Sequence, residues 1–204
     1  MHNYLIKSTI SRVLSFFISI FSTLFWILLA ITFEDVSVAI ISVVCVIIHE
    51  CGHLCCLRLF GKKTSIRSII NGFKITSYDL LSYKEERAVY LSGPFFNLLS
   101  ALFVLPFAKN DYAFNFITLS FLTAISNLLP IEGYDGFGAI RCFIEEKYVS
   151  PTPFQILSFL SFCLVFAFCI MSLYLIDRVG EGYWIYAIFL ASLIKAIKRD
   201  ITIQ

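Results

Sequence analysis

The chain has 204 residues, of which 59% are apolar, 17% are aromatic and only 15% are charged. A soluble domain needs polar surface to cover its core, so this composition predicts a membrane protein and excludes a disordered chain. The net charge of +2 with dispersed basic residues offers no basic surface, and no nucleic-acid partner is expected. The seven cysteines lie in or beside apolar runs, and an odd number cannot pair completely, which favours free thiols.

Hydrophobic runs that could cross a membrane recur along the chain, since a crossing takes about 20 helical residues. Six runs cover approximately residues 13–33, 36–59, 88–108, 113–131, 154–176 and 182–197. The last run is the shortest and depends on Lys195 reaching the membrane interface. The predicted fold class is therefore a polytopic α-helical membrane protein with about six transmembrane helices.

The distribution of basic residues predicts the topology. If the N-terminus is cytoplasmic, every lysine and arginine except Lys109 and Arg178 falls on the cytoplasmic side. This asymmetry follows the positive-inside rule and predicts a multi-pass protein with both termini in the cytoplasm. The length and the lack of other targeting signals favour a prokaryotic cell membrane, and an organelle membrane remains the alternative.

Two cytoplasmic loops are expected, at residues 61–87 and 132–153. In the first, β-branched and polar residues alternate on either side of Asn71-Gly72, a dipeptide typical of tight hairpin turns. We therefore expect a small β element at the cytoplasmic face between the second and third spans. Neither loop is long enough for a soluble domain.

Five consecutive residues, His49-Glu50-Cys51-Gly52-His53, place three ionisable side chains inside the second apolar run. A central charge in a span costs on the order of 2.5–3.5 kcal/mol, so a functional role is the default interpretation. Histidines at i and i+4 share a helical face, while Glu50 points about 100° away, which is the pattern of zinc hydrolases. The alternative is a chance match in which both histidines bond to nearby carbonyls. It is disfavoured because the chain has only three histidines.

A catalytic zinc ion takes three protein ligands and leaves a fourth position for water, so the two histidines need a partner. Cys56 shares their face, but it lies about 10.5 Å along the helix from His49, too far to converge on one ion. Asp135, at the cytoplasmic end of the fourth run, is the best acid available. Glu132 remains the alternative third ligand.

These motifs resemble the site-2 protease family of intramembrane zinc metalloproteases over about residues 36–140. In that family the HExxH motif is completed by an aspartate from a later Asn-Pro-x-Asp-Gly or Leu-Asp-Gly motif. His49, Glu50, His53 and Asp135 match those positions. The six-span plan is similar to the branch of the sporulation factor IVFB protease, without its CBS domain.

A third motif strengthens the resemblance, whereas the segment before Asp135 departs from the family pattern. The segment Gly93-Pro94-Phe95-Phe96-Asn97 looks like the Gly-Pro-x-x-Asn element of the bacterial members. Residues 130–136, in contrast, have Pro-Ile-Glu-Gly-Tyr-Asp-Gly where the family usually has Pro-x-x-Pro-Leu-Asp-Gly. This departure is the reason that Glu132 competes with Asp135 as the third ligand.

The resemblance implies a zinc metalloendopeptidase formed by a single integral-membrane domain, residues 1–204, with its catalytic core at about 36–140. One zinc ion per chain would be held by His49, His53 and Asp135, with Glu50 as the general base. The expected substrate is a membrane-tethered protein or peptide precursor, cut near the cytoplasmic face. An inactive relative that binds transmembrane segments and a metal transporter are the alternatives. The intact Glu50 disfavours the first, and the clustering of polar residues at one depth disfavours the second.

A helical substrate must unwind before it can be cut, and an exposed strand could bind the unwound segment by adding it to a sheet. Asparagines within apolar runs either bind the substrate backbone or orient ligands and bond between helices. Gly93 and Pro94 either make room beside the metal or form a simple packing kink. The candidate substrate-binding residues are Gly72, Phe73, Lys74 and Ile75 of the predicted hairpin, with Asn97 and Asn127.

Overall fold

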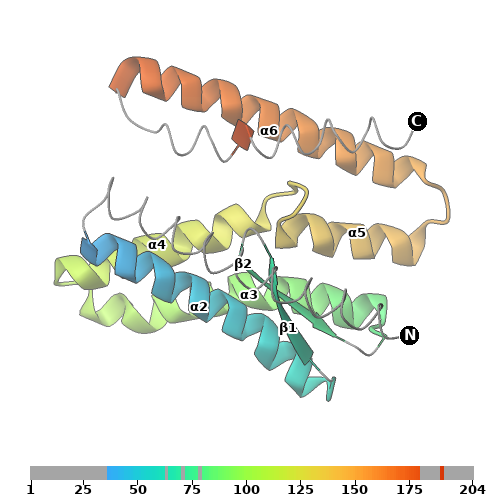
Figure 1. Ribbon diagram of the computed structural model, residues 1–204, viewed down its shortest axis with the longest axis horizontal. Helices are drawn as coiled ribbons and strands as arrows, with labels where there is room; N and C mark the ends of the chain where they lie inside the picture. Colours follow the sequence, from blue (N-terminus) through green and yellow to red (C-terminus); the bar gives the residue numbers. More distant parts are fainter. Residues whose placement is uncertain (1–35, 63, 70–71, 78–79, 180–188, 191–204) are drawn as a thin grey trace, which may run out of the picture.

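The computed structural model describes residues 36–62, 64–69, 72–77, 80–179 and 189–190 (Figure 1). In chain order the elements are α2 (Val36–Leu59), β1 (Thr64–Ile69), β2 (Gly72–Ser77), α3 (Tyr83–Val104), the 3-10 helix η1 (Leu105–Phe107), α4 (Asp111–Leu128), α5 (Asp135–Lys147) and α6 (Thr152–Val179). The predicted span at 13–33 lies outside the described residues, as does nearly all of the span at 182–197 and both termini.

Three described helices are long and apolar enough to cross a membrane: Val36–Leu59, Tyr83–Phe107 and Thr152–Arg178. They coincide with the second, third and fifth predicted runs. Helix α4 occupies the fourth predicted run, but its 18 residues include Asp111 and Asn115, and it is not among the three. A membrane protein with three such helices is therefore supported, and the count of six spans stays a prediction.

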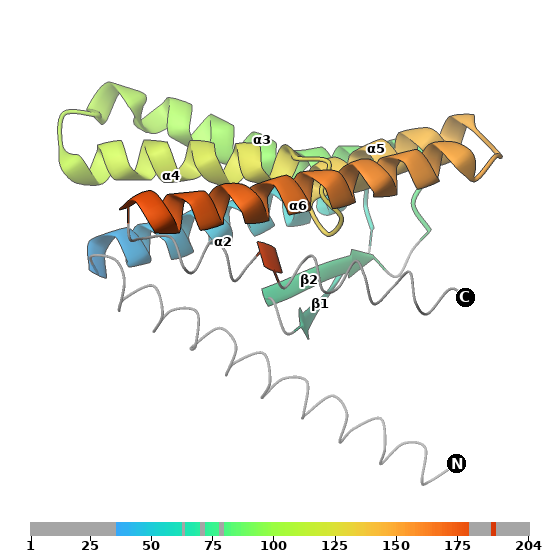
Figure 2. The same ribbon diagram turned by 90° about the horizontal axis from the view of Figure 1, so that it is seen from above.

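Helices α2, α3 and α4 pack against one another, α3 also packs against α5, and α6 packs against α5 (Figures 1 and 2). The crossing of α2 and α3 is close because Gly52 has no side chain. A Cβ atom on Gly52 would lie 2.6 Å from the carbonyl oxygen of Ser92. Small residues at helix crossings allow such backbone contact inside membranes. The result is that one face of α3 lies directly against the HExxH segment of α2.

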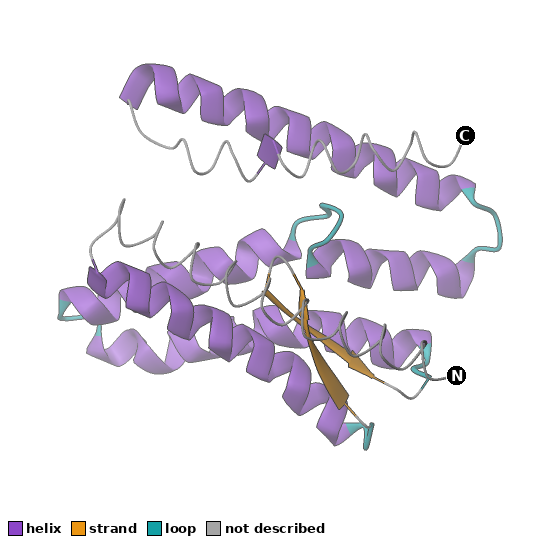
Figure 3. Cartoon of the chain, in the orientation of Figure 1, coloured by secondary structure: helices purple, strands orange, loops and turns teal. Residues whose placement is uncertain are grey.

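The loop predicted to contain a β element holds the hairpin of β1 and β2 (Figure 3). The strands pair antiparallel, from Thr64 opposite Ser77 to Ile69 opposite Gly72, and both contact α2. Among the described residues this hairpin is a sheet of two strands, so each strand has an outer edge without a partner strand. Its cytoplasmic placement stays a prediction.

Helix α3 begins at Tyr83, five residues before the predicted start of the third run. The reason is a capping box at Ser82. The Ser82 hydroxyl accepts a hydrogen bond from the Glu85 backbone N–H, and the Glu85 carboxylate accepts one from the Ser82 backbone N–H at 2.8 Å. Lys62, three residues after the end of α2, adds an ion pair to Glu85 at 3.2 Å. Polar residues thus extend the helix beyond its apolar run.

The second expected loop, residues 132–153, is not a simple loop, because α5 occupies Asp135–Lys147. The short turn between α4 and α5 is held against α6. Ile131 is 1% exposed and packs in a cluster with Val165 and Cys169. The Glu132 backbone N–H donates a hydrogen bond to the Ser161 hydroxyl at 2.8 Å. These contacts fix where α5, and with it Asp135, begins.

Candidate metal centre

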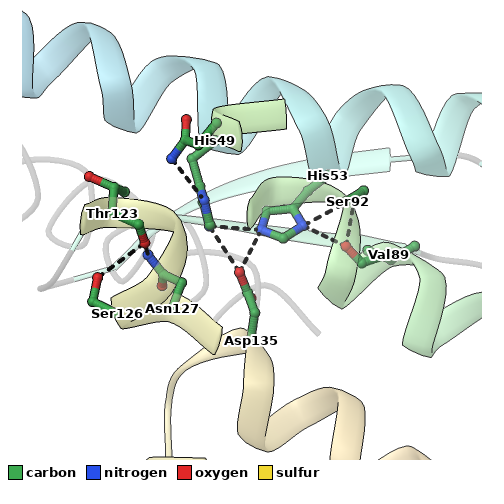
Figure 4. A network of polar contacts seen from close by, with 9 residues as sticks. His49, His53, Val89, Ser92, Thr123, Ser126, Asn127 and Asp135 are labelled. Atoms are coloured by element: carbon green, nitrogen blue, oxygen red, sulfur yellow. Dashed lines mark hydrogen bonds and ion pairs between the residues drawn. The ribbon is translucent and has the colours of Figure 1, made fainter. Parts of the chain in front are cut away.

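Helix α2 places His49 and His53 one turn apart on the face that it buries. Their exposed fractions are 5% and 9%, and their Nε2 atoms are 3.2 Å apart. The rings meet edge to face, with an angle of 84° between their planes. Figure 4 shows both rings directed toward the same point between α2 and the start of α5. The i, i+4 spacing therefore brings both rings to one face of the helix, as the sequence predicts.

Asp135 brings the third donor atom from another helix. It is the first residue of α5, and its Oδ2 atom lies 2.9 Å from Nε2 of His49 and 3.3 Å from Nε2 of His53 (Figure 4). Among the described residues, these three form the one group of metal-ligand side chains that converge. Glu132 does not belong to it. The structure thus favours Asp135 over Glu132 as the third ligand.

The donor atoms fit a metal ion better than they fit one another. The carbonyl of Val89 lies 2.7 Å from Nδ1 of His53 and can only accept, so Nδ1 carries the proton and a neutral ring leaves a lone pair on Nε2. Oδ2 of Asp135 is buried and has no hydrogen-bond donor. Zinc ligands at about 2.0–2.1 Å in a tetrahedron are about 3.3 Å apart, which is close to the 2.9–3.3 Å between these donor atoms.

The carboxyl of Asp135 is charged at neutral pH. Burial raises the pKa of this group, but when the imidazoles of His49 and His53 carry protons on Nε2, their hydrogen bonds and charge together lower the pKa by more, so it lies below the ordinary value for aspartate. Two neutral imidazoles and one carboxylate are typical ligands of a catalytic zinc site with an open position. Glu50, the next residue after His49, is close enough to interact electrostatically with all three side chains.

Gly93 on α3 makes room for the imidazole pair. A Cβ atom at this position would lie 2.5 Å from Nε2 of His53 and 2.8 Å from Cε1 of His49. The interpretation of Gly93 as space beside the metal therefore fits the geometry. Pro94 is buried inside α3, which continues through it from Tyr83 to Val104.

Two nearby groups were not predicted from the sequence. The Val89 carbonyl has no sequence signal, because every residue has one. The Ser92 hydroxyl lies 3.5 Å from Nδ1 of His53 and donates to the Val89 carbonyl at 2.6 Å. Ser92 precedes the Gly-Pro motif directly, but a serine in an apolar helix is too common to mark a site.

No cysteine joins the group. Cys56 lies outside it, as the helical rise predicts. Cys45 is buried one turn before His49, where its sulfur lies 3.2 Å from the Ser120 hydroxyl of α4. On α5, burial and the nearby Glu86 raise the pKa of the Cys142 thiol to about 11. Cys142 is therefore a protonated core thiol at neutral pH. All seven cysteines are free, as predicted.

No protein-family model matches the chain, and no curated protein matches its sequence. Among solved structures, the chain is similar to one described as "Site-2 Protease from Methanocaldococcus jannaschii". The TM-score is 0.63 and the sequence identity 18%, and the match covers 89% of this chain and 87% of that chain. The chain has the fold of a site-2 protease. At this identity the likeness establishes the fold, and the function must be argued from the site.

Within this site-2 protease fold, the residues predicted to bind substrate lie in three places. Asn97 is fully buried on α3, with Nδ2 3.5 Å from Nδ1 of His49. Asn127 lies near the end of α4, and its Nδ2 donates to the Thr123 carbonyl of its own helix at 2.9 Å (Figure 4). Residues 72–75 belong to β2. The structure thus brings Asn97 to the metal group, and the other substrate roles stay predictions.

Proposed function

We propose that this protein is an intramembrane zinc endopeptidase, which hydrolyses a peptide bond of a membrane-tethered protein or peptide precursor near the cytoplasmic face. The observation that carries the proposal is the convergence of His49 Nε2, His53 Nε2 and Asp135 Oδ2 within 3.3 Å of one another. Three apolar helices and the site-2 protease fold support a membrane setting for this group. We also propose that the protein belongs to the branch of this family that contains the sporulation factor IVFB protease.

The donor set assigns each residue a task. A zinc ion held by His49, His53 and Asp135 would supply a Lewis acid for the scissile carbonyl and would lower the pKa of a water molecule to about 7. Glu50 lies beside the three ligands without belonging to the group, so it is available to take a proton from the attacking water. The same carboxylic acid then returns the proton to the leaving nitrogen, which becomes an amine. His49, His53 and Asp135 stay deprotonated at their donor atoms throughout.

The hairpin is the proposed guide for the substrate. A peptide bond inside a helix has its carbonyl and N–H groups engaged, so the segment must be extended before cleavage. The outer edge of β2, with Gly72, Phe73, Lys74 and Ile75, has backbone groups that can pair with an extended segment. The hairpin also contacts α2, the helix with the HExxH motif.

The first test is the metal content of detergent-purified protein. We expect close to one zinc ion per wild-type chain, and the same content in Glu50→Gln, because Glu50 is not a ligand. If well-folded wild type contains no zinc even after zinc is added during purification, the proposed metal site is wrong.

The second test is a search for cleavage sites in membranes of cells that express wild type, Glu50→Gln or the matched control Cys51→Ala. Cys51 is exposed on the same helical turn and has no assigned task. New protein N-termini within or beside transmembrane segments should appear with wild type and Cys51→Ala and be absent with Glu50→Gln. New termini that persist in Glu50→Gln contradict the mechanism. Zinc binding with no new termini in any sample favours the alternative of an inactive binder of membrane segments.

A further inference from the structure

The two imidazoles need a second partner each, because a histidine that binds metal through Nε2 must carry its proton on Nδ1. Partners that fix this tautomer and the ring orientation commonly change metal affinity by 10–100-fold when they are removed. For His53 the partner is the Val89 carbonyl, which lies 2.7 Å from Nδ1 and can only accept, so it holds the proton on Nδ1. For His49 the neighbour of Nδ1 is a side-chain amide.

That amide belongs to Asn97, which is fully buried inside α3. Its nitrogen lies 3.5 Å from Nδ1 of His49, and its oxygen has no hydrogen-bond partner. An amide nitrogen only donates, so it cannot accept a hydrogen bond from the proton that Nδ1 must carry. The two ends of an amide have nearly the same shape. Rotation of the Asn97 amide group by about 180° therefore places its oxygen beside Nδ1 of His49. This rotation breaks no hydrogen bond of the oxygen, because the oxygen has none.

The positions along α3 support this arrangement. Val89, Gly93 and Asn97 follow at intervals of four residues and so lie along one side of the helix. Val89 offers a carbonyl to His53, and Gly93 leaves the space that both rings fill. Asn97, one turn further on, stands beside His49. Three successive turns of α3 thus contact His53, both rings and His49 in that order.

We propose that Asn97 is a positioning residue, whose amide oxygen accepts a hydrogen bond from Nδ1–H of His49 and so presents Nε2 to the metal. The role assigned to Asn97 is therefore not that of a substrate-binding group. The inference rests on the metal site of the proposed function. It makes α3 the helix that orients both histidine ligands, one through its backbone and one through a side chain.

The test compares Asn97→Leu, which keeps the size and removes the acceptor, with Asn97→Asp, which keeps an acceptor. Zinc affinity of detergent-purified protein is measured by competition with a chelator of known affinity. Asn97→Leu should bind zinc about 10–100-fold more weakly than wild type, and Asn97→Asp should stay within a few-fold of it. The matched control is Ser120→Ala, which removes another buried polar group against α2, one turn from the site, and should bind zinc as wild type does.

Spectroscopy gives a signal that would not change if Asn97 served only in packing. Cobalt in place of zinc should show an altered visible spectrum in Asn97→Leu but not in Ser120→Ala. In the zinc-loaded wild type, labelling with ¹⁵N-histidine should show protonated Nδ1 on both buried rings. This second measurement needs no variant, so it holds even where Asn97→Leu does not fold.

The outcomes separate the two proposals. Equal zinc affinity of wild type, Asn97→Leu and Asn97→Asp would overturn the role of Asn97 and leave the metal site intact. Equal weakening in Leu and Asp variants would also overturn it, because only packing would then be affected. If Nδ1 of His49 carries no proton in the zinc-loaded protein, the role of Asn97 is also overturned. A wild type that binds no zinc overturns both proposals together.

Discussion

The proposed metal site is built from two regions that differ in how they hold its three side chains. His49 and His53 come from one continuous helix and are pressed against the backbone of a second helix at Gly93. Asp135 begins a different helix, after a turn that is held by Ile131 and a hydrogen bond to α6. The first region is defined by local helical geometry, and the second by tertiary contacts with a helix that contributes no ligand.

This difference separates the ways in which the site can fail. A change where α3 touches the two rings, at Gly93, alters the shape of the histidine pair itself. A change at the turn leaves the pair intact and moves the carboxylate relative to it. Both kinds of damage should weaken zinc binding, the first through the two histidine ligands and the second through the carboxylate.

The largest effect is expected from Asp135→Ala, which removes the carboxylate and leaves two ligands. Zinc affinity should fall by more than about 100-fold, exceeding the effect of losing an orienting partner. Glu132→Ala is the matched control, since it removes a carboxylate three residues earlier that does not join the group. Measurement of zinc per chain after dialysis checks both. If Glu132→Ala loses zinc and Asp135→Ala retains it, the ligand assignment is wrong.

Gly93→Ala tests the first region. The added methyl group would lie 2.5 Å from Nε2 of His53, so either the ring or α3 must move. Overpacking of this kind costs about 1–3 kcal/mol, and if the ring moves, zinc affinity falls by about 5–150-fold. Leu102→Ala, on the exposed side of the same helix, is the control and should bind zinc normally. Chelator competition gives the affinities, and unchanged zinc binding by Gly93→Ala would show that the pair is not confined by α3.

The two regions also differ in how far the sequence predicts them. The histidine pair follows from the i, i+4 spacing alone, because the fixed rise and rotation of a helix determine where both side chains point. Asp135 could be named as a candidate through its place near the end of an apolar run and through its match to the aspartate motif of the family. Its choice over Glu132 depends on where α5 begins, and that depends on contacts with α6, more than 20 residues later in the sequence.

Other features were missed because they are set by polar caps or by the backbone. The early start of α3 follows from Ser82 and Glu85, which an analysis of apolar runs does not count. The sequence predicts a loop where α5 lies, because the 13 residues of this helix are amphipathic and too short for a span. The Val89 carbonyl, which orients His53, has no side-chain signal at all. The fold was thus predictable where burial in apolar surroundings decides it, and not where single hydrogen bonds do.

Ile131→Ala tests the second region, with Leu57→Ala as its counterpart in the first. Both side chains are 1% exposed, and truncation of a buried aliphatic residue costs about 2–5 kcal/mol of unfolding free energy. Both variants should therefore unfold at lower temperature in detergent. Only Ile131→Ala should also lower the zinc affinity of the folded protein, by several-fold, because it loosens the turn before Asp135. Equal zinc affinities in the two variants would show that packing of this turn does not position the ligand.

The smallest effect is expected from Ser161→Ala, which removes the acceptor for the Glu132 backbone N–H. One such hydrogen bond contributes about 0.5–1.5 kcal/mol, so zinc affinity should fall by no more than about tenfold. Ser172→Ala is a closely matched control, because Ser172 is equally buried on α6 but donates only to the Cys169 carbonyl of its own helix. A difference between the two variants in chelator competition isolates the contribution of the turn from that of α6 itself. If Ser172→Ala weakens zinc binding as much as Ser161→Ala does, the effect comes from the packing of α6, and the hydrogen bond to the turn does not place Asp135.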